Sequence, residues 1–435
     1  PLFIFDKNII DELPKDDARV SFIHERLDKI DTELQKFGKN LAVFHGDPIT
    51  IINQIISENQ IEAIYTNHDY EPYAKKRDQE ITSILKEKNI EFNTFKDQVI
   101  FEKSEVVKDD QTPYVVYTPY SRKWKDLFQR SKLEHFESEK LLNNIVYHSY
   151  PFLSLKDIGF EQSKIKVAHF DTSDKLIENY EDTRNFPAIE GTSMIGTHLR
   201  FGSVSIRKIV ANAASHKRET YLNELIWREF FMQILWHFPH TNKKSFRPKY
   251  DAIKWNNNEE EFQKWCEGKT GYPFVDACMR NLISEGWITF RMRAMLVSFA
   301  SYQLWIDWRL SGNYLAKLFT DFEPGIHFSQ LQMQSGVTGI NAMRVYNPIK
   351  QSIEHDINGH FIKKWVPELI DLPEKFIHEP WKLTTIEQEM YNFKLGINYP
   401  YPIVDVEKTR KYSSDILWNL RKDKEVKNRA ILIRI

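Results

Sequence analysis

Residues 270–309 carry the clearest structural pattern in the chain, TGYPFVDACMRNLISEGWITFRMRAMLVSFASYQLWIDWR. Gly271 can take backbone angles that are closed to other residues, and Pro273 suits the first turn of a helix. Apolar residues then recur every three or four positions, which predicts a helix with one face in a core. They are Val275, Cys278, Met279 and Leu282. Gly286 interrupts the pattern, and we expect the helix to end there.

A second helix is expected after Gly286, and it carries two arginines, Arg291 and Arg293, among apolar residues. A buried cation without an anionic partner costs much free energy, so both arginines need an anion nearby. An internal ion pair with a carboxylate is the simpler interpretation. A phosphate or an electron-rich cofactor is the alternative.

The composition limits the class of protein. The 435 residues are enough for two or three domains, and the 41% hydrophobic content permits large cores. A formal net charge of -1 means that nucleic-acid binding would need a local basic patch. The two cysteines exclude a disulfide framework and a four-cysteine metal cluster, and they fit a reducing cytoplasm. No apolar run reaches membrane-spanning length, no signal peptide is visible, and we expect a cytoplasmic monomer without a metal site.

Strand and helix patterns alternate in the first third of the chain. Strands are predicted at residues 2–5, 41–45 and 63–66, and helices at 18–37, 49–59 and 75–88. This alternation favours a parallel sheet with helices on both faces. Because PLFIFD at the start already has the pattern of a buried strand, we expect a further N-terminal strand and helix before it. Asp47, between Gly46 and Pro48, follows a strand where such folds bind ligands, although a helix start is the commoner reason.

Three regions are expected along the chain. Residues 1–105 form the α/β domain, and residues 106–166 lose periodicity and predict a connection between domains with one helix near 120–130. Residues 167–435 are dominated by helical patterns. The sequence therefore predicts an N-terminal α/β domain followed by an all-helical domain.

Two further segments carry candidate polar groups. Thr192 and Ser193 precede a helical pattern, so either could cap its N-terminus, and the same hydroxyls and amides suit an anion. Glu224 and Arg228 are four residues apart, which allows an ion pair on one helix face, with Trp227 beside it. The alternative is a polar pair that lines a cavity with aromatic walls and suits a planar ligand.

A series of motifs, in one order along nearly the whole chain, resembles the photolyase/cryptochrome flavoproteins, and among them the class I cyclobutane pyrimidine dimer photolyases. The motifs are GTSMIGTHLRFGSVSIR at 191–207, ELIWREFF at 224–231, TGYPFVDACMR at 270–280 with the GW and RMR that follow, DWR at 307–309, RVYNP at 344–348, GHFI and WVPEL within 359–369, and YPYPIVD at 399–405. Each string alone is weak, but their shared order is specific.

The resemblance implies a Rossmann-like antenna domain and an all-helical domain that holds FAD without a covalent bond. It also implies a deoxyribodipyrimidine photolyase, in which blue light drives an electron from reduced FAD to a cyclobutane pyrimidine dimer in UV-damaged DNA. The alternatives are a cryptochrome-type photoreceptor without repair, or a photolyase for another lesion. A short C-terminus after residue 405 favours repair.

The resemblance also assigns residues to four groups. FAD would be contacted by Tyr180, Thr192, Ser193, Met194, Ile195, Gly196, Tyr221, Glu224, Arg228, Arg293, Asp321, Phe322, Glu323 and His327, with Arg293 paired to Asp321. DNA would be contacted by Trp227, Arg228, Phe290, Met333 and Arg344, with Arg207, Lys208, Lys217 and Arg218 as further phosphate-binding candidates. The predicted catalytic residues are Glu224 on the pyrimidine edge, Trp227 as the stacking wall and His327 at flavin N5, and Trp308 and Trp255 would transfer electrons.

Several positions depart from the family pattern. His327 replaces an asparagine, and we expect it to titrate near neutrality and to make flavin chemistry depend on pH. Leu331 and Met333 replace tryptophans, so photoreduction needs another aromatic residue or is slow. Tyr73 and Ala74 replace an Asn-Glu pair that holds a folate in some relatives, so both the presence and the identity of a second, antenna chromophore are left open. Further changes are Gly196, Phe290 and Ala294.

Overall fold

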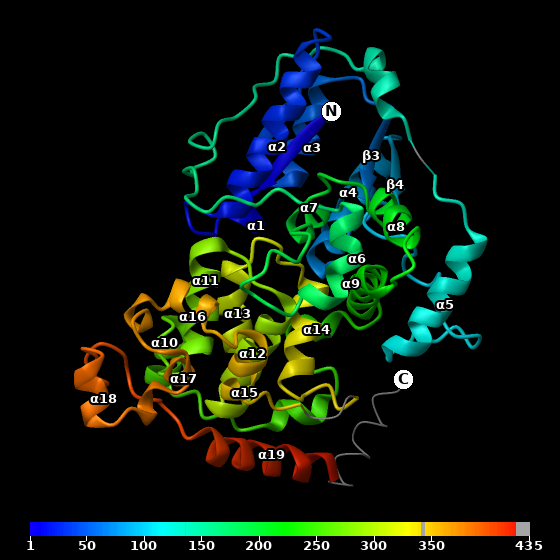
Figure 1. Ribbon diagram of the computed structural model, residues 1–435. Helices are drawn as coiled ribbons and strands as arrows, with labels where there is room; N and C mark the ends of the chain where they lie inside the picture. The colour runs from blue at the N-terminus through cyan, green and yellow to red at the C-terminus, as the bar shows by residue number, and fades with distance from the viewer. Residues whose placement is uncertain (135, 341–343, 423–435) are drawn as a thin grey trace. The chain divides into compact units, whose positions relative to one another are not determined.

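The computed structural model describes residues 1–134, 136–340 and 344–422, which form two compact units (Figure 1). Unit 1 comprises Pro1–Phe170 and Met194–His237, and unit 2 comprises Asp171–Ser193 and the described part of Phe238–Ile435. The domain boundaries at residues 105 and 166 stay a prediction. Among the described helices, none combines the length and apolar character needed to cross a membrane.

The α/β part of unit 1 contains four parallel-paired strands. β1 (Leu2–Asp6) pairs with β2 (Ala42–Gly46), and β3 (Ala63–Asn67) pairs with β4 (Glu91–Phe95). The three predicted strands are therefore confirmed to within two residues. β4 was missed because its sequence EFNTF is largely polar and only Phe92 packs against the neighbouring apolar cluster.

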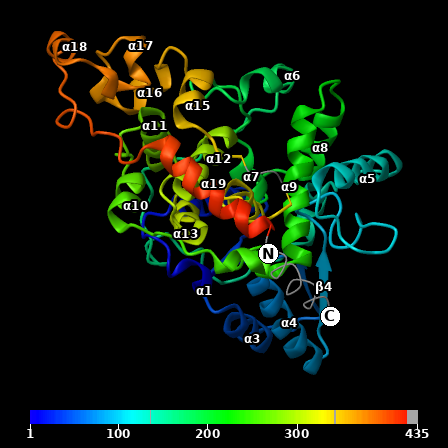
Figure 2. The ribbon, with the colours of Figure 1, turned by 90° about the horizontal axis from the view of Figure 1, so that it is seen from below.

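The helices of unit 1 follow the predicted pattern in the first third and add others. They are α1 (Lys7–Ile10), α2 (Ala18–Gln35), α3 (Pro48–Glu58), α4 (Pro72–Glu87), α5 (Tyr117–Arg130), the 3₁₀ turn Ser138–Asn144, α7 (Gly196–Arg200), α8 (Ile206–Ala214) and α9 (Thr220–His237). Figure 2 shows α5 and α8 beside α9, and both contact it. Asp47 caps α3 by accepting a hydrogen bond from the Thr50 amide, so the helix-start interpretation of this residue is confirmed.

Unit 2 contains helices and short helical turns, and no strand among its described residues. The helices are α6 (Asp174–Thr183), α10 (Glu259–Cys266), α11 (Pro273–Glu285), α12 (Phe290–Ser298), α13 (Trp308–Leu318), α14 (Pro324–Gln334), α15 (Pro348–His355), α16 (His360–Trp365), α17 (Glu374–Ile377), α18 (Thr385–Met390) and α19 (Val406–Lys422). The turns are Pro239–Asn242, Pro248–Ala252, Phe299–Gln303, Pro367–Leu369 and Pro380–Lys382.

The core of unit 2 is built around α11 and α12, as the sequence predicts. The four apolar residues of the predicted stripe on α11 are all 0% exposed. Gly286 ends α11 with a φ of 67°, in the left-handed region that favours glycine. Gly271 has a φ of 79°, and a Cβ added there would lie 2.3 Å from the Tyr401 carbonyl oxygen. Both glycines are therefore required by the backbone at the ends of this element.

One predicted helix start is wrong. Neither Thr192 nor Ser193 caps α7, because the helix begins later, at Gly196, with Ile195 at the N-cap position and no side-chain capping bond. Met194 has a φ of 53°, which a helical residue cannot have. The helix ends at Arg200, and α8 begins at Ile206 with Ser205 at its N-cap position.

Candidate functional site

The residues predicted to contact FAD and DNA fall in both compact units. Unit 1 carries Met194, Ile195, Gly196, Tyr221, Glu224, Trp227 and Arg228. Unit 2 carries Tyr180, Thr192, Ser193, Arg293, Asp321, Phe322, Glu323 and His327, together with Trp255, Trp308, Phe290, Met333 and Arg344.

The indole of Trp227 on α9 lies flat against Tyr117 of α5. The ring centroids are 3.6 Å apart and the planes differ by 5°, which makes a full face-to-face contact. The Tyr117 hydroxyl donates a hydrogen bond to the Asn223 carbonyl oxygen at 3.0 Å. Tyr117 thereby fixes the orientation of Trp227. Sequence reasoning missed this residue, because nothing local at the start of α5 indicates its distant partner.

A buried carboxylate anchors α9 one turn beyond Glu224. Glu229 accepts hydrogen bonds from the amides of Ile100 (2.7 Å) and Phe101 (3.0 Å) and from the Trp124 indole nitrogen (2.6 Å). Burial raises the pKa of Glu229 to about 7. Arg228 donates to the Gln98 carbonyl oxygen at 2.6 Å. The helix that presents Glu224 and Trp227 is therefore tied to the segment after β4 and to α5.

In unit 2, the predicted pair between Arg293 and Asp321 is confirmed. The guanidinium donates two parallel hydrogen bonds to the carboxylate, both at 2.9 Å, and a third to the Ile288 carbonyl oxygen. For Arg293, the interpretation as an internal ion pair with a carboxylate is thus confirmed. Arg291 differs, because its Nε is a buried donor without an acceptor among the described residues.

His327 on α14 lies close to this pair and is neutral at ordinary pH. Its Nε2 is 2.9 Å from the Gly312 carbonyl oxygen, which can only accept, so Nε2 carries the proton and Nδ1 is free of it. Burial, with a smaller contribution from the charge of Arg293, lowers the pKa of His327 to about 4. The expectation that this histidine titrates near neutrality is therefore wrong. Its placement at flavin N5 stays a prediction.

The turn at residues 191–196 has an unusual backbone. A Cβ on Gly191 would lie 2.4 Å from the Thr183 hydroxyl oxygen, so only glycine fits there. Ser193 is buried, and the positive φ of Met194 places strain directly after it. Strain of this kind is retained where the surrounding structure holds it, often at ligand sites. The hydroxyls and amides of this turn have the chemistry that a pyrophosphate needs.

The predicted electron-transfer residues lie in two aromatic settings. Trp308 is 0% exposed, with the Arg309 guanidinium 4.7 Å from its ring centroid. Trp255 packs against Trp305 at 4.8 Å, and Trp305 is 5.8 Å from Tyr412. These last three residues line one pocket of unit 2, and sequence reasoning missed Trp305 and Tyr412.

Leu331 stands where the family pattern has a tryptophan, and its aliphatic side chain is not an electron carrier. It is 2% exposed and lies so close to Gly312 that a Cβ there would be 2.5 Å from the leucine. Trp308 has Phe328 as a neighbour at 6.4 Å. Leu331 is therefore a buried packing residue, and the gap in the tryptophan series stays a prediction.

The predicted DNA contacts differ in exposure. Phe290 begins α12 and is 46% exposed, Arg344 is exposed, and Met333 on α14 is partly buried. Of the further phosphate-binding candidates in unit 1, Lys208, Lys217 and Arg218 are exposed. Arg207 is 3.2 Å from Asp97 and donates to the Lys96 carbonyl oxygen, so part of its charge is already compensated.

Side-chain hydrogen bonds connect the residues at the carboxyl ends of β1 and β2. The Tyr73 hydroxyl donates to Asp6 at 2.6 Å, and the Asn8 amide nitrogen is 3.1 Å from that hydroxyl and 3.3 Å from Asp47. Tyr73 thus takes part in a polar network at the place where α/β folds bind ligands. These contacts assign no antenna chromophore.

The protein thus combines a parallel α/β unit with a helical unit that carries an arginine–aspartate pair. The family model for the FAD binding domain of DNA photolyase matches residues 221–419, and that for DNA photolyase matches residues 1–139. A deoxyribodipyrimidine photo-lyase of Alkalihalophilus pseudofirmus is 34% identical over 403 residues, which cover 87% of this chain and 83% of that protein. The chain belongs to the DNA photolyase family, and FAD is the cofactor of its helical domain.

Other comparisons agree with this assignment. A deoxyribodipyrimidine photo-lyase of Agrobacterium fabrum is 30% identical, covering 94% of this chain and 90% of that protein. A class III photolyase structure from Agrobacterium tumefaciens has a TM-score of 0.84 at 26% identity, over 97% of this chain and 92% of that one. The structure of an archaeal photolyase from Sulfolobus tokodaii, with two FAD molecules, has a TM-score of 0.79 at 28% identity. The match covers 96% of this chain and 93% of that one. Membership of class I stays a prediction.

Proposed function

We propose that the protein is a blue-light-driven deoxyribodipyrimidine photolyase that splits cyclobutane pyrimidine dimers in UV-damaged DNA. The observation that carries this proposal is the similarity to enzymes of that name over most of the chain, at 34% identity in one case. The architecture agrees, because the α/β unit and the helical FAD domain are both present. Action as a cytoplasmic monomer belongs to the same proposal.

The residues of the chain suit FAD. Thr192 and Ser193 offer hydroxyls and amides to the pyrophosphate, at a turn whose backbone is held in an uncommon conformation. Arg293 and Asp321 form a rigid charged pair, and the cation would favour a reduced, anionic flavin. The bound FAD would supply one electron to the lesion on illumination and take it back after bond cleavage.

Three features of α9 suit a flipped pyrimidine dimer. Trp227 presents a planar surface held by Tyr117, and stacking on an aromatic ring is worth about 1–3 kcal/mol per base. Glu224 lies almost one turn earlier on the same helix and would form a hydrogen bond with the pyrimidine edge. The hydrogen bonds of Glu229 hold the helix that carries both groups.

A photoreceptor that does not repair DNA is the second candidate function. It is favoured by Leu331, which is buried and aliphatic, and by Met333 and Phe290 at positions predicted to contact the lesion. These changes alter the route of photoreduction and one wall of the pocket. They leave Glu224 and Trp227 in place, which is why repair remains the main proposal.

Replacement of Glu224 tests the proposed function. With FAD bound and chemically reduced, Glu224→Ala should lower light-driven dimer repair by about ten- to a hundredfold, because a lost hydrogen bond to a charged group costs about 1.5–3 kcal/mol. Flavin content should not change. Glu219→Ala is the matched control, since Glu219 is an exposed acid next to the same helix. Equal repair by both variants would remove Glu224 from the mechanism.

A further inference from the structure

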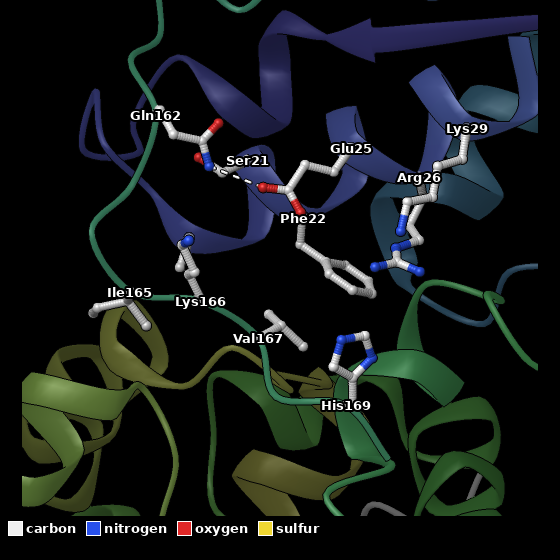
Figure 3. Close-up of a pocket in the computed structure, with 11 residues that line it drawn as sticks. Ser21, Phe22, Glu25, Arg26, Lys29, Gln162, Ile165, Lys166, Val167 and His169 are labelled. Carbon is white, nitrogen blue, oxygen red and sulfur yellow. Dashed lines mark hydrogen bonds between the residues drawn. The ribbon is translucent and has the colours of Figure 1, made fainter. Parts of the chain in front are cut away.

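Unit 1 contains a pocket of about 200 Å³ between α2 and residues 162–169 (Figure 3). Its lining is rich in cationic and imidazole side chains, which are Arg26, Lys29, Lys166 and His169. Glu25 is the one acid in the lining. None of these residues is among those predicted to contact FAD or the lesion, so the pocket is a separate feature.

The cationic groups of this pocket lack anionic partners within the structure. The Glu25 carboxylate accepts a hydrogen bond from the Gln162 amide at 3.0 Å, and Figure 3 shows it directed toward that residue. Among the described residues, no ion pair joins Arg26, Lys29 or Lys166 to an acid. Arg26 and Lys29 are three residues apart on α2 and line the same pocket, and Figure 3 draws their side chains on the side where His169 lies. Like charges that share a pocket repel, and a bound anion would relieve this repulsion.

Arg26 is held in place and has an unused donor. Its guanidinium lies over the Phe22 ring, 4.9 Å from the centroid, and Phe22 is itself buried against His198. The Nε of Arg26 is buried and has no hydrogen-bond acceptor in the described part of the chain. A buried donor without an acceptor costs about 1–3 kcal/mol, so an acceptor from a ligand is expected.

We propose that this pocket binds a phosphate group. A guanidinium presents its donors in a fork that matches two phosphate oxygens, and Arg26 is already oriented by Phe22. Lys29 adds positive charge to the same pocket, and the His169 ring offers a further nitrogen donor there. The volume suits a phosphate or diphosphate group and not a large planar molecule. The phosphate belongs to a small phosphorylated molecule or to a nucleic-acid backbone, which share this chemistry.

Calorimetric titration of the FAD-loaded protein with inorganic pyrophosphate at low salt tests the proposal. Saturable binding is expected, and Arg26→Gln and Lys29→Gln should each weaken it at least tenfold. Lys36→Gln is the matched control, because Lys36 follows the same helix but pairs with Glu33 outside the pocket. Absence of binding at millimolar pyrophosphate would overturn the proposal. Equal affinity in the wild type and in Lys29→Gln, an exposed position where folding is not at risk, would also overturn it.

Competition identifies the source of the phosphate. If an undamaged single-stranded oligonucleotide displaces pyrophosphate and loses this ability in Lys29→Gln, the site takes a backbone phosphate. If pyrophosphate binds and the oligonucleotide does not compete, the site takes a small phosphorylated molecule. Both titrations are made in the dark and without a lesion, so their outcome is independent of the proposed repair function.

Discussion

Two buried carboxyl groups, one in each unit, both need hydrogen-bond donors, and they obtain them from different parts of the chain. Asp276 on α11 accepts hydrogen bonds from the amide (2.7 Å) and hydroxyl (2.6 Å) of Thr270, from the Gly271 amide (3.1 Å) and from the Tyr399 hydroxyl. Glu229 on α9 is held by four donors from unit 1, which are the amides of Ile100 and Phe101, the Tyr120 hydroxyl and the Trp124 indole nitrogen. Burial raises the pKa of both carboxyl groups above the usual value.

The difference lies in the distance along the chain. Three of the donors to Asp276 belong to Thr270 and Gly271, five or six residues away, and only the Tyr399 hydroxyl is remote, at 123 residues. The donors to Glu229 are all remote, from Trp124 at 105 residues to Ile100 at 129. The first carboxylate therefore fixes a local turn at the start of a core helix and ties it to Tyr399, whereas the second joins α9 to remote segments only. We infer that Asp276 serves the fold of unit 2 alone, while Glu229 serves the position of the helix that carries Glu224 and Trp227.

Removal of Asp276 should have the largest effect. In Asp276→Ala, the amide and hydroxyl of Thr270 lose their acceptor in a site that is 0% exposed. The free energy of unfolding should fall by about 3–5 kcal/mol, the range for breaking a buried charged network. Urea unfolding measures it, with the exposed Asp371→Ala as control. A loss below about 1 kcal/mol would show that the turn does not depend on this carboxylate.

The carboxyl group of Glu229 should make stability depend on pH. Its pKa is about 7 in the folded protein and near 4.5 when unfolded, so the native state binds the proton more tightly. The contribution of Glu229 to the free energy of unfolding is therefore fully present below about pH 4.5. It is lost as the pH rises to about 7, and the loss is at most about 3 kcal/mol. Urea unfolding against pH should show this slope in the wild type and not in Glu229→Gln. Parallel pH profiles would contradict the assignment.

The stack of Tyr117 on Trp227 should affect lesion binding and not folding. Trp227→Ala should weaken binding of dimer-containing DNA about tenfold, because a stacking surface for a base is lost. Tyr117→Leu should weaken it several-fold by releasing the indole, and Tyr117→Phe should retain the stack and the affinity. The readout is the ratio of affinities for damaged and undamaged DNA. An unchanged ratio in Tyr117→Leu would assign Tyr117 a structural role only.

His327 should have the smallest effect near neutral pH. Because its pKa is about 4, the ring stays neutral from pH 6 upward, and the lifetime of the flavin radical should not change with pH there. A change should occur near pH 4 in the wild type and be absent in His327→Asn. Transient absorption of the FAD-loaded protein measures this. A transition near pH 6.5 that His327→Asn removes would contradict the lowered pKa.

The sequence predicted those parts of the fold that local patterns determine. Gly271, Pro273 and Gly286 mark the ends of α11, and the structure has the helix within these limits. The helix after Ile195 began later than expected, because the backbone at Met194 leaves the helical region. That strain depends on tertiary packing around the turn, which no local pattern reports.

The site was predictable where the resemblance names both partners. The pair of Arg293 and Asp321 follows from the motifs, and the structure confirms it. Tyr117 and Glu229 were not predicted, since each is defined by contacts with residues more than a hundred positions away. The pKa of His327 was misjudged for a related reason, because its burial and its bond to Gly312 appear only in the folded chain.

Light-driven repair by the chemically reduced protein tests the central claim most directly. Chemical reduction of the bound FAD bypasses the gap at Leu331, so the assay reports on the pocket and not on photoreduction. Under blue light, DNA containing cyclobutane pyrimidine dimers should regain the absorbance of intact pyrimidines, and a dark sample should not. Absence of recovery in the light, with FAD bound and reduced, would contradict the assignment as a cyclobutane dimer photolyase.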